Sequence, residues 1–135
     1  MTFIDSNILV YSIDDNSPEK QRKARAIVAR AIGGHGFMVS AQVLNEFTNV
    51  ALAKMRLTLP EVGKFVTVFN RIKSVPVDCR WTERALAIKA QYGTQFYDSL
   101  LIAAAEANGC DEFWSEDLND GQLYCGVKAP CGSKG

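Results

Sequence analysis

Short apolar stretches alternate with longer amphipathic ones along this 135-residue chain. The apolar stretches have the length of short buried strands and lie at residues 3–4, 37–40, 74–77, 112–115 and 123–127. Between them, apolar side chains recur every three or four residues, which is the spacing of one face of a helix. This alternation predicts an α/β domain with a mainly parallel sheet. The proline within residues 74–77 places that strand at an edge of the sheet.

Local signals indicate where the helices begin and end. Ser17 and Pro18 are typical of a helix start, and the glycines from Gly33 onward are expected to end that helix. Thr58 and Glu61 match a capping box, which opens a helix whose apolar stripe extends through residue 72. We interpret this wide stripe as core, with a dimer contact as the alternative. The other long helices are expected at residues 41–56, 81–92 and 97–108.

Two acids come directly after short apolar strands. Asp5 ends the first strand, and Asp117 follows the strand at residues 112–115. The carboxyl ends of parallel strands meet at one edge of a sheet, and ligands bind at that edge. Each acid alone also has a structural interpretation, because Asp5 can cap the following helix and Asp117 can form a turn.

Two more acids are expected to point inward from helices. Glu46 falls on the apolar stripe of its helix, where an unpaired carboxylate is costly to bury. Asp98 lies in the first helical turn, where the helix N-terminus stabilises negative charge, although a capping role would also explain it. Acids that meet at one rim need a counter-charge, and ligands that are all oxygen suit Mg²⁺ or Mn²⁺. The sequence therefore predicts a metal site of the kind that activates water or stabilises phosphoryl oxygens, formed by Asp5, Glu46, Asp98 and Asp117.

The overall charge does not by itself favour a polyanionic partner. The chain has 15 basic and 15 acidic side chains, so a polyanion would bind only where basic residues gather on one face. The candidates for contacting RNA are Lys20, Arg22, Lys23, Lys54 and Arg56, and ordinary solvated surface is the alternative for each. With 47% apolar residues, one globular domain is expected over residues 1–127, and residues 128–135 form a tail that is a candidate for disorder.

Several other classes of site are disfavoured. The four cysteines and the single His35 lack the spacing of a zinc site, so reduced and mostly buried thiols and a solvent-exposed histidine are expected. Phosphate-binding loops, dinucleotide fingerprints and the nucleophile elbow are absent, which leaves a metal-dependent hydrolase among common enzymes. No apolar run has the length of a membrane span and no leader pattern opens the chain, so a cytoplasmic protein is expected.

Taken together, four stretches of this sequence resemble PIN-domain nucleases, especially the VapC-like toxins of bacterial and archaeal toxin–antitoxin pairs. They are FIDSNILVY at residues 3–11, NEF at 45–47, YDSLLIAAA at 97–105 and SEDL at 115–118. The resemblance extends to about Gly126 and implies a three-layer α/β/α sandwich with about four to five short strands. It also implies a Mg²⁺- or Mn²⁺-dependent endoribonuclease that is commonly a homodimer and is held inactive by a cognate antitoxin.

The resemblance also implies roles for individual residues. It assigns catalysis and metal binding to Asp5, Glu46, Asp98 and Asp117, with Asn7 and Ser115 as supporting polar residues. The resulting hypothesis is in-line hydrolysis of an RNA phosphodiester, with Asp5 and Asp98 as the principal metal ligands. Residues 128–135 depart from the strand that often closes chains of this family.

Two alternatives stay open at this stage. One is a PIN-like nucleic-acid-binding or scaffold domain without catalysis. The other is a metal-dependent phosphatase of the haloacid-dehalogenase type, a class that needs an acid two residues after the first one. Here the corresponding run is Asp5-Ser6-Asn7, which disfavours the phosphatase.

Overall fold

Six short strands form one sheet in the part of the chain that the computed structural model describes, residues 1–33 and 36–130. The strands are β1 (Thr2–Ile4), β2 (Phe37–Ser40), β3 (Lys73–Val75), β4 (Glu112–Trp114), β5 (Leu123–Tyr124) and β6 (Val127–Lys128). They lie in the order β3-β2-β1-β4-β6-β5, and only β5 runs antiparallel to its neighbour. The carboxyl ends of β1 and β4 therefore lie side by side at one edge of the sheet.

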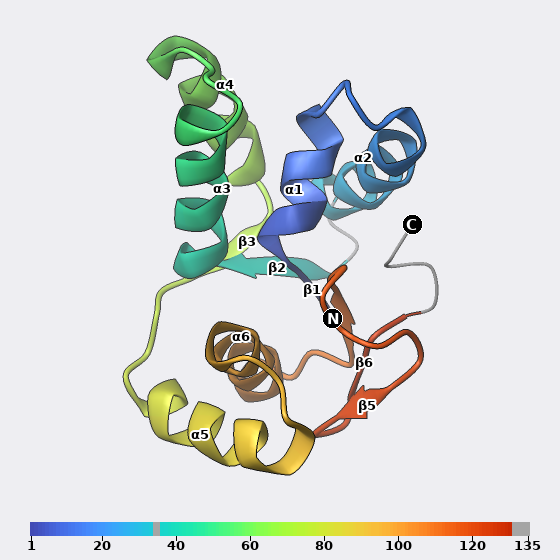
Figure 1. Cartoon of the computed structure of the whole chain (residues 1–135), viewed down its shortest axis with the longest axis vertical. Coiled ribbons are helices and arrows are strands. Elements are labelled where there is room, and N and C mark those ends of the chain that lie inside the picture. The colour runs from blue at the N-terminus through green and yellow to red at the C-terminus, as the bar shows by residue number, and fades with distance from the viewer. Residues whose placement is uncertain (34–35, 131–135) are drawn as a thin grey trace.

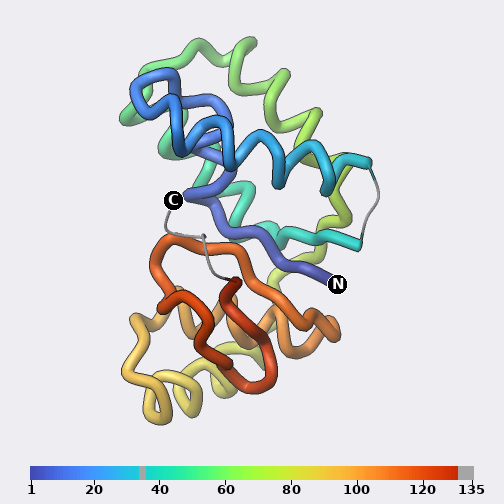
Figure 2. The backbone as a smooth tube through the Cα atoms, turned by 90° about the vertical axis from the view of Figure 1, so that its right-hand side faces the viewer, coloured from blue at the N-terminus to red at the C-terminus, as the bar shows by residue number. Residues whose placement is uncertain are grey.

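Helices cover both faces of the sheet. They are α1 (Ser6–Ile13), α2 (Pro18–Ile32), α3 (Ala41–Ala53), α4 (Leu59–Phe69), α5 (Arg80–Tyr92) and α6 (Phe96–Ala107). Helices α1 to α4 lie on one face, and α5 and α6 lie on the other (Figure 1). Figure 2 shows the same two helical layers after a quarter turn, with the first strand between them. Within residues 1–33 and 36–130, every helix is too short or too polar to span a lipid bilayer.

Aromatic side chains form part of the core on the strands that carry the site and between the helices that cover them. Phe3 on β1 and Phe113 on β4 are fully buried and stack with ring centroids 5.1 Å apart. Phe47 of α3 meets Phe69 of α4 edge to face at 4.8 Å. Burying each such ring stabilises the fold by roughly 1.5–3 kcal/mol. The buried Phe3–Phe113 pair therefore lies directly before the carboxyl ends of β1 and β4.

The predicted α/β architecture with a mainly parallel sheet is confirmed, and the strand near residue 74 does lie at an edge. The number of strands differs, because residues 123–127 form a hairpin and not one strand. Cys125 and Gly126 separate β5 from β6, and both have positive φ angles, of 53° and 81°. A two-residue turn with positive φ at both positions matches the twist of a hairpin. The Cys-Gly pair is not one of the usual sequence signals for this turn.

Helix ends also differ from expectation. The capping box of Thr58 and Glu61 is present, but its helix ends at Phe69, and the buried Ile72 lies beyond it. The helix expected at residues 41–56 ends at Ala53, before the positive φ of 54° at Arg56 breaks helical geometry.

Two residues that follow position 127 take part in the fold. Strand β6 includes Lys128, and Ala129 is fully buried. Within the described residues, the thiol prediction was wrong in one respect, because only Cys110 is buried while Cys125 is half-buried and Cys79 is exposed. The expectations for His35, Cys131 and the end of the tail fall outside the described residues.

Candidate active site

Asp5 lies where β1 passes into α1, and the fold holds both of its carboxylate oxygens. Its backbone N–H donates to the carbonyl of Trp114 at 2.9 Å, which continues the pairing of β1 with β4. Oδ1 accepts a hydrogen bond from the backbone N–H of Ser6 at 2.6 Å and so caps α1. Oδ2 accepts a hydrogen bond from Ser115 Oγ at 2.7 Å. The side chain is therefore both a helix cap and a candidate site residue.

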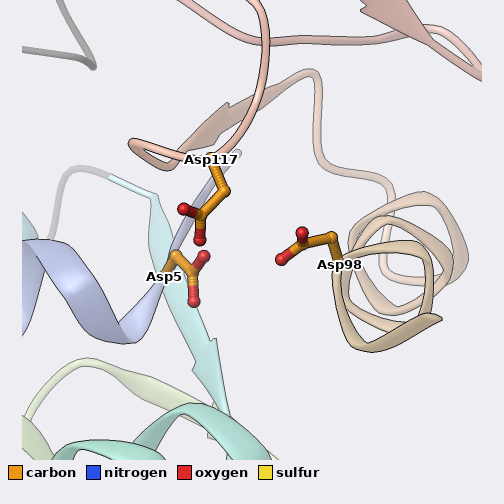
Figure 3. A group of neighbouring side chains, drawn as sticks. All are labelled: Asp5, Asp98 and Asp117. Atoms are coloured by element: carbon orange, nitrogen blue, oxygen red, sulfur yellow. The ribbon is translucent and has the colours of Figure 1, made fainter. Parts of the chain in front are cut away.

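Two other acids meet Asp5 at this edge of the sheet (Figure 3). Asp98 lies in the first turn of α6 and is half-buried, and Asp117 is exposed in the loop after β4. One carboxylate oxygen from each of Asp5, Asp98 and Asp117 lies within 4.8 Å of the others. Residues that are far apart in the sequence thus form one acidic cluster, a name used below for these three side chains.

Burial and mutual repulsion both act on the acidic cluster. Burial raises the pKa of Asp5 to about 7, even though the hydrogen bonds from Ser115 and Ser6 lower it, and the negative charges of Glu46 and Asp117 raise it further. Burial also raises the pKa of Asp98 to about 6, and repulsion from Asp117 and Glu46 adds to this shift. Both pKa shifts come mainly from burial, and no positive charge from the described residues lowers either pKa.

Glu46 lies beside the acidic cluster and not within it. Its Oε1 accepts a hydrogen bond from Gln42 Nε2 at 2.7 Å, and its Oε2 accepts one from Ser6 Oγ at 2.9 Å. The charge of Glu46 raises the pKa of Asp5 and of Asp98, so its carboxylate is close enough to act on both. Of the four acids predicted to meet, three form the acidic cluster, and the fourth, Glu46, adjoins it.

The two supporting positions contact the acids. Asn7 Nδ2 donates to Asp117 Oδ2 at 3.3 Å. Ser115 Oγ donates to Asp5 and accepts a hydrogen bond from the backbone N–H of Asp117 at 3.2 Å. One serine thus connects two members of the acidic cluster.

Only one of the five basic candidates touches the loop that carries Asp117. Lys20 Nζ forms an ion pair with Glu116 at 2.9 Å. Arg22 pairs with Glu19 on the exposed surface of α2, and Lys23 is exposed on the same helix.

The other two basic candidates, Lys54 and Arg56, follow the end of α3. That helix starts at the carboxyl end of β2, so its 13 residues carry the chain about 20 Å away from the site edge. The five basic side chains therefore do not form one patch around the acidic cluster.

Three polar contacts of the site were not predicted from the sequence. Gln42 precedes Glu46 by four residues on α3, a spacing that puts them on one face and that the sequence displays. Ser6 reaches Glu46 only because α1 and α3 pack together, and Glu116 meets Lys20 from 96 positions away. No local pattern encodes the last two contacts.

Two cavities are lined by acids of the site. Asp98, Asp117 and Asn119 help line a cavity of about 400 Å³. Glu46 and Tyr97 help line another, of about 660 Å³. Two members of the acidic cluster and the neighbouring Glu46 are therefore accessible to a ligand.

The acidic cluster fits a hard divalent cation. Oxygen ligands at roughly 2.1 Å from Mg²⁺ lie at most about 4.2 Å apart, so the 4.8 Å span of Asp5, Asp98 and Asp117 needs only small side-chain adjustments. Carboxylate oxygens are the ligands that Mg²⁺ and Mn²⁺ prefer. A cation would also offset the repulsion between the carboxylates, which adds to the raised pKa values of Asp5 and Asp98.

A mainly parallel sheet with acids gathered at its carboxyl edge defines an α/β protein with a candidate metal-dependent site. The sequence profile of the PIN domain family matches residues 2–119. The chain belongs to the PIN domain family. Comparison of the sequence with curated proteins gives no significant match.

Solved structures share this fold. One is a toxin–antitoxin complex from Klebsiella pneumoniae, with a TM-score of 0.69 and 17% identity over 96% of this chain and 98% of the other. Another is the Mycobacterium tuberculosis toxin VapC20, described as cleaving the sarcin–ricin loop, with a TM-score of 0.63 and 13% identity over 90% and 92%. At these identities the similarity is one of fold.

Proposed function

We propose that this protein is a Mg²⁺- or Mn²⁺-dependent endoribonuclease that hydrolyses RNA phosphodiester bonds. The observation that carries the proposal is the acidic cluster, in which Asp5, Asp98 and Asp117 meet within 4.8 Å at the carboxyl edge of the sheet. Membership of the PIN domain family supports a nuclease. The description of VapC20 as a toxin that cleaves the sarcin–ricin loop supports RNA as the substrate.

In this proposal the acids hold the cation and the polar side chains hold the acids. Asp5 and Asp98 are the principal ligands, and Asp117 completes the set directly or through water. Oδ1 of Asp5 accepts two hydrogen bonds, from the backbone N–H and the hydroxyl of Ser6, whereas Oδ2 accepts one, from Ser115, which leaves a lone pair on Oδ2 for a cation. When bound, the cation makes water a stronger acid and offsets negative charge on the phosphate.

Glu46 has a different place in the proposed reaction. Gln42 and Ser6 hold its carboxylate next to the acidic cluster, where it completes the site directly or through water. The cavity lined by Asp98 and Asp117 and the cavity lined by Glu46 would accept nucleotides next to the cleaved bond. Contacts to those nucleotides would place the phosphate beside the acids, where a bound cation would offset its negative charge.

We further propose that the protein is the toxin of a toxin–antitoxin pair, that it acts in the cytoplasm as a homodimer, and that a cognate antitoxin inhibits it. The Klebsiella pneumoniae structure, described as a toxin–antitoxin complex, supports this context. Co-purification with the product of the neighbouring open reading frame, together with loss of RNA cleavage on its addition, would test it.

The decisive experiment is Mn²⁺-dependent cleavage of a mixed RNA pool, with Asp5→Ala as the control. The proposal predicts cleavage by the wild-type protein that stops when a chelator removes Mn²⁺, and no cleavage by the variant. Intact RNA with Mn²⁺ present would contradict it. Hydrolysis of small phosphomonoesters in place of RNA would indicate the phosphatase alternative, and lack of Mn²⁺ binding would indicate a non-catalytic scaffold.

A further inference from the structure

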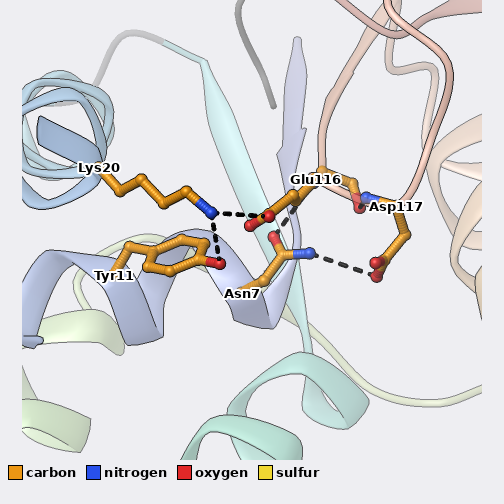
Figure 4. Close-up of polar contacts among 6 residues, drawn as sticks. Asn7, Tyr11, Lys20, Glu116 and Asp117 are labelled. Carbon is orange, nitrogen blue, oxygen red and sulfur yellow. Dashed lines mark hydrogen bonds and ion pairs between the residues drawn. The ribbon is translucent and has the colours of Figure 1, made fainter. Parts of the chain in front are cut away.

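A chain of polar contacts leads from α2 to the acidic cluster (Figure 4). Lys20 Nζ lies 2.9 Å from Glu116 Oε1 and donates to the Tyr11 hydroxyl at 3.1 Å. The backbone N–H of Glu116 donates to Asn7 Oδ1 at 3.4 Å. Asn7 Nδ2 in turn donates to Asp117 Oδ2 at 3.3 Å. The chain that starts at Lys20 therefore ends on a carboxylate of the acidic cluster.

The geometry of α1 explains how this chain forms. Asn7 and Tyr11 are four residues apart on α1, so they lie on one face of it, toward the loop after β4. Lys20 also lies over the Tyr11 ring, with Nζ 4.7 Å from the ring centroid. The side chains of Lys20 and Glu116 are 35% and 28% exposed, so solvent screens this ion pair less than a fully exposed one.

Asp117 lies on a less regular stretch of backbone than the other members of the acidic cluster do. Asp5 is fixed by the end of a strand and Asp98 by a helix, whereas Asp117 is exposed and lies in a loop. The buried side chain of Leu118 anchors this loop on one side of Asp117. Glu116 anchors it on the other side through the contact with Lys20.

We infer that Lys20 is a positioning residue for the acidic cluster. With Tyr11 it holds Glu116, so that Glu116 and Asn7 keep Asp117 where it can bind a divalent cation. This inference rests on the proposed function, in that it requires the cluster to bind Mg²⁺ or Mn²⁺. It gives Lys20 a role that does not depend on direct contact with RNA.

The test measures the affinity of the full chain for Mn²⁺ alone by titration calorimetry. Lys20→Met removes the positive charge and keeps a side chain of similar shape. Residues that support metal ligands typically contribute 10–100-fold to metal affinity, so Lys20→Met is expected to weaken Mn²⁺ binding by about tenfold or more. The matched control is Arg80→Met, which breaks the ion pair between Arg80, the first residue of α5, and Asp78, which precedes the helix, and is expected to leave Mn²⁺ affinity unchanged.

A double-variant cycle shows whether Lys20 acts through Glu116. Glu116→Gln breaks the same ion pair, so the variant with both substitutions is expected to lose little more affinity than the more affected single variant. Melting curves without metal are expected to stay close to wild type, because a partly exposed ion pair contributes little to stability. They therefore separate a loss of positioning from a loss of folding.

Two results would overturn the inference. One is an Mn²⁺ affinity of Lys20→Met that equals that of the wild-type protein. If that variant nevertheless cleaved RNA more slowly, Lys20 would be assigned to direct RNA contact. The other is a pair of affinity losses that add independently in the double variant. Failure of the proposed function looks different, because the wild-type protein itself would then bind no Mn²⁺.

Discussion

Asp5 and Asp98 contribute carboxylates to the same cluster, but the two regions that carry them hold these side chains in different ways. Asp5, at the junction of β1 and α1, is 3% exposed and accepts hydrogen bonds on both oxygens, from Ser6 and Ser115. Asp98 is half-buried in the first turn of α6, and its pKa reflects burial and the charges of Asp117 and Glu46, without a hydrogen bond from the described residues.

Because of this difference, Asp5 is expected to contribute both to folding stability and to the site, whereas Asp98 is expected to contribute to the site alone. Removing Asp5 deletes a helix cap and leaves the buried hydroxyl of Ser115 without its acceptor, so both folding and the site are affected. Removing the charge of Asp98 costs no such contact within the described residues and relieves repulsion. The two acids are therefore expected to be equally needed for cation binding and unequally needed for stability.

The largest effect is expected from Asp98→Asn. Loss of a proposed metal ligand should lower RNA cleavage by more than about 100-fold, beyond the 10–100-fold typical of groups that only support a ligand. The same substitution should raise the melting temperature of the metal-free protein near pH 8, because it removes a repelled negative charge. Initial cleavage rates and thermal melts measure the two effects. Cleavage at the wild-type rate would show that Asp98 is not a ligand.

The second effect is a fall in metal-free stability between pH 5 and pH 8. The folded-state pKa values of about 7 for Asp5 and about 6 for Asp98 exceed the ordinary value of 3.8, so the folded state binds more protons than the unfolded state in this range. The stability that these two groups contribute is then lost as pH rises through their folded pKa values, by an amount on the order of a few kcal/mol.

Urea unfolding at several pH values, with and without Mg²⁺, measures this decline. Asp98→Asn should reduce the slope but leave the part due to Asp5, and Mg²⁺ should oppose the loss at pH 8. A metal-free stability that increased from pH 5 to pH 8 would contradict the assignment of raised pKa values to the acidic cluster.

A third effect concerns the hydrogen bond that holds Asp5. Ser115→Ala removes the 2.7 Å hydrogen bond to Oδ2 and should cost about 1–3 kcal/mol of stability and about tenfold in Mn²⁺ affinity. Ser12→Ala is the matched control, because Ser12 is also buried and donates within α1 to the carbonyl of Leu9. Unfolding curves and Mn²⁺ titrations of both variants make the comparison. Equal Mn²⁺ affinity in the two variants would count against a role for Ser115 in the site.

The smallest effect on RNA cleavage is expected from a substitution on α3. Gln42→Ala removes the hydrogen bond to Glu46 Oε1, a pair of the i,i+4 kind that contributes only about 0.2–0.5 kcal/mol. Ser6 still holds the other oxygen of Glu46, so cleavage should fall no more than a few-fold. Steady-state kinetics at saturating Mn²⁺ would show this. A loss of cleavage as large as that of Asp98→Asn would mean that Glu46 depends on its hydrogen bonds as much as Asp5 does.

Much of this arrangement is predictable from the sequence, because strand ends in a parallel sheet have defined neighbours. The places of Asp5, Asp98 and Asp117 follow from acids at the ends of apolar strands and in a first helical turn. The family resemblance added Asn7 and Ser115, and both contact the acids. These residues are placed by backbone geometry, which local patterns of sequence encode.

What the sequence did not reveal depends on packing between distant elements or on unusual backbone angles. Glu46 lies outside the acidic cluster and contacts Ser6 and Gln42. Lys20 meets Glu116 only because α2 and the loop after β4 pack together. The hairpin at Cys125 uses a positive φ angle at a residue that rarely adopts one, so no turn signal marked it.

The most direct test of the central claim is a calorimetric titration of Mn²⁺ into the metal-free protein at neutral pH, with Asp98→Asn measured in parallel. If the acidic cluster is a cation site, the wild-type protein binds Mn²⁺ saturably and the folded variant shows little or no binding. If the wild-type protein bound no Mn²⁺, or if both proteins bound it equally, the three carboxylates would not form the metal site on which the proposed nuclease activity depends.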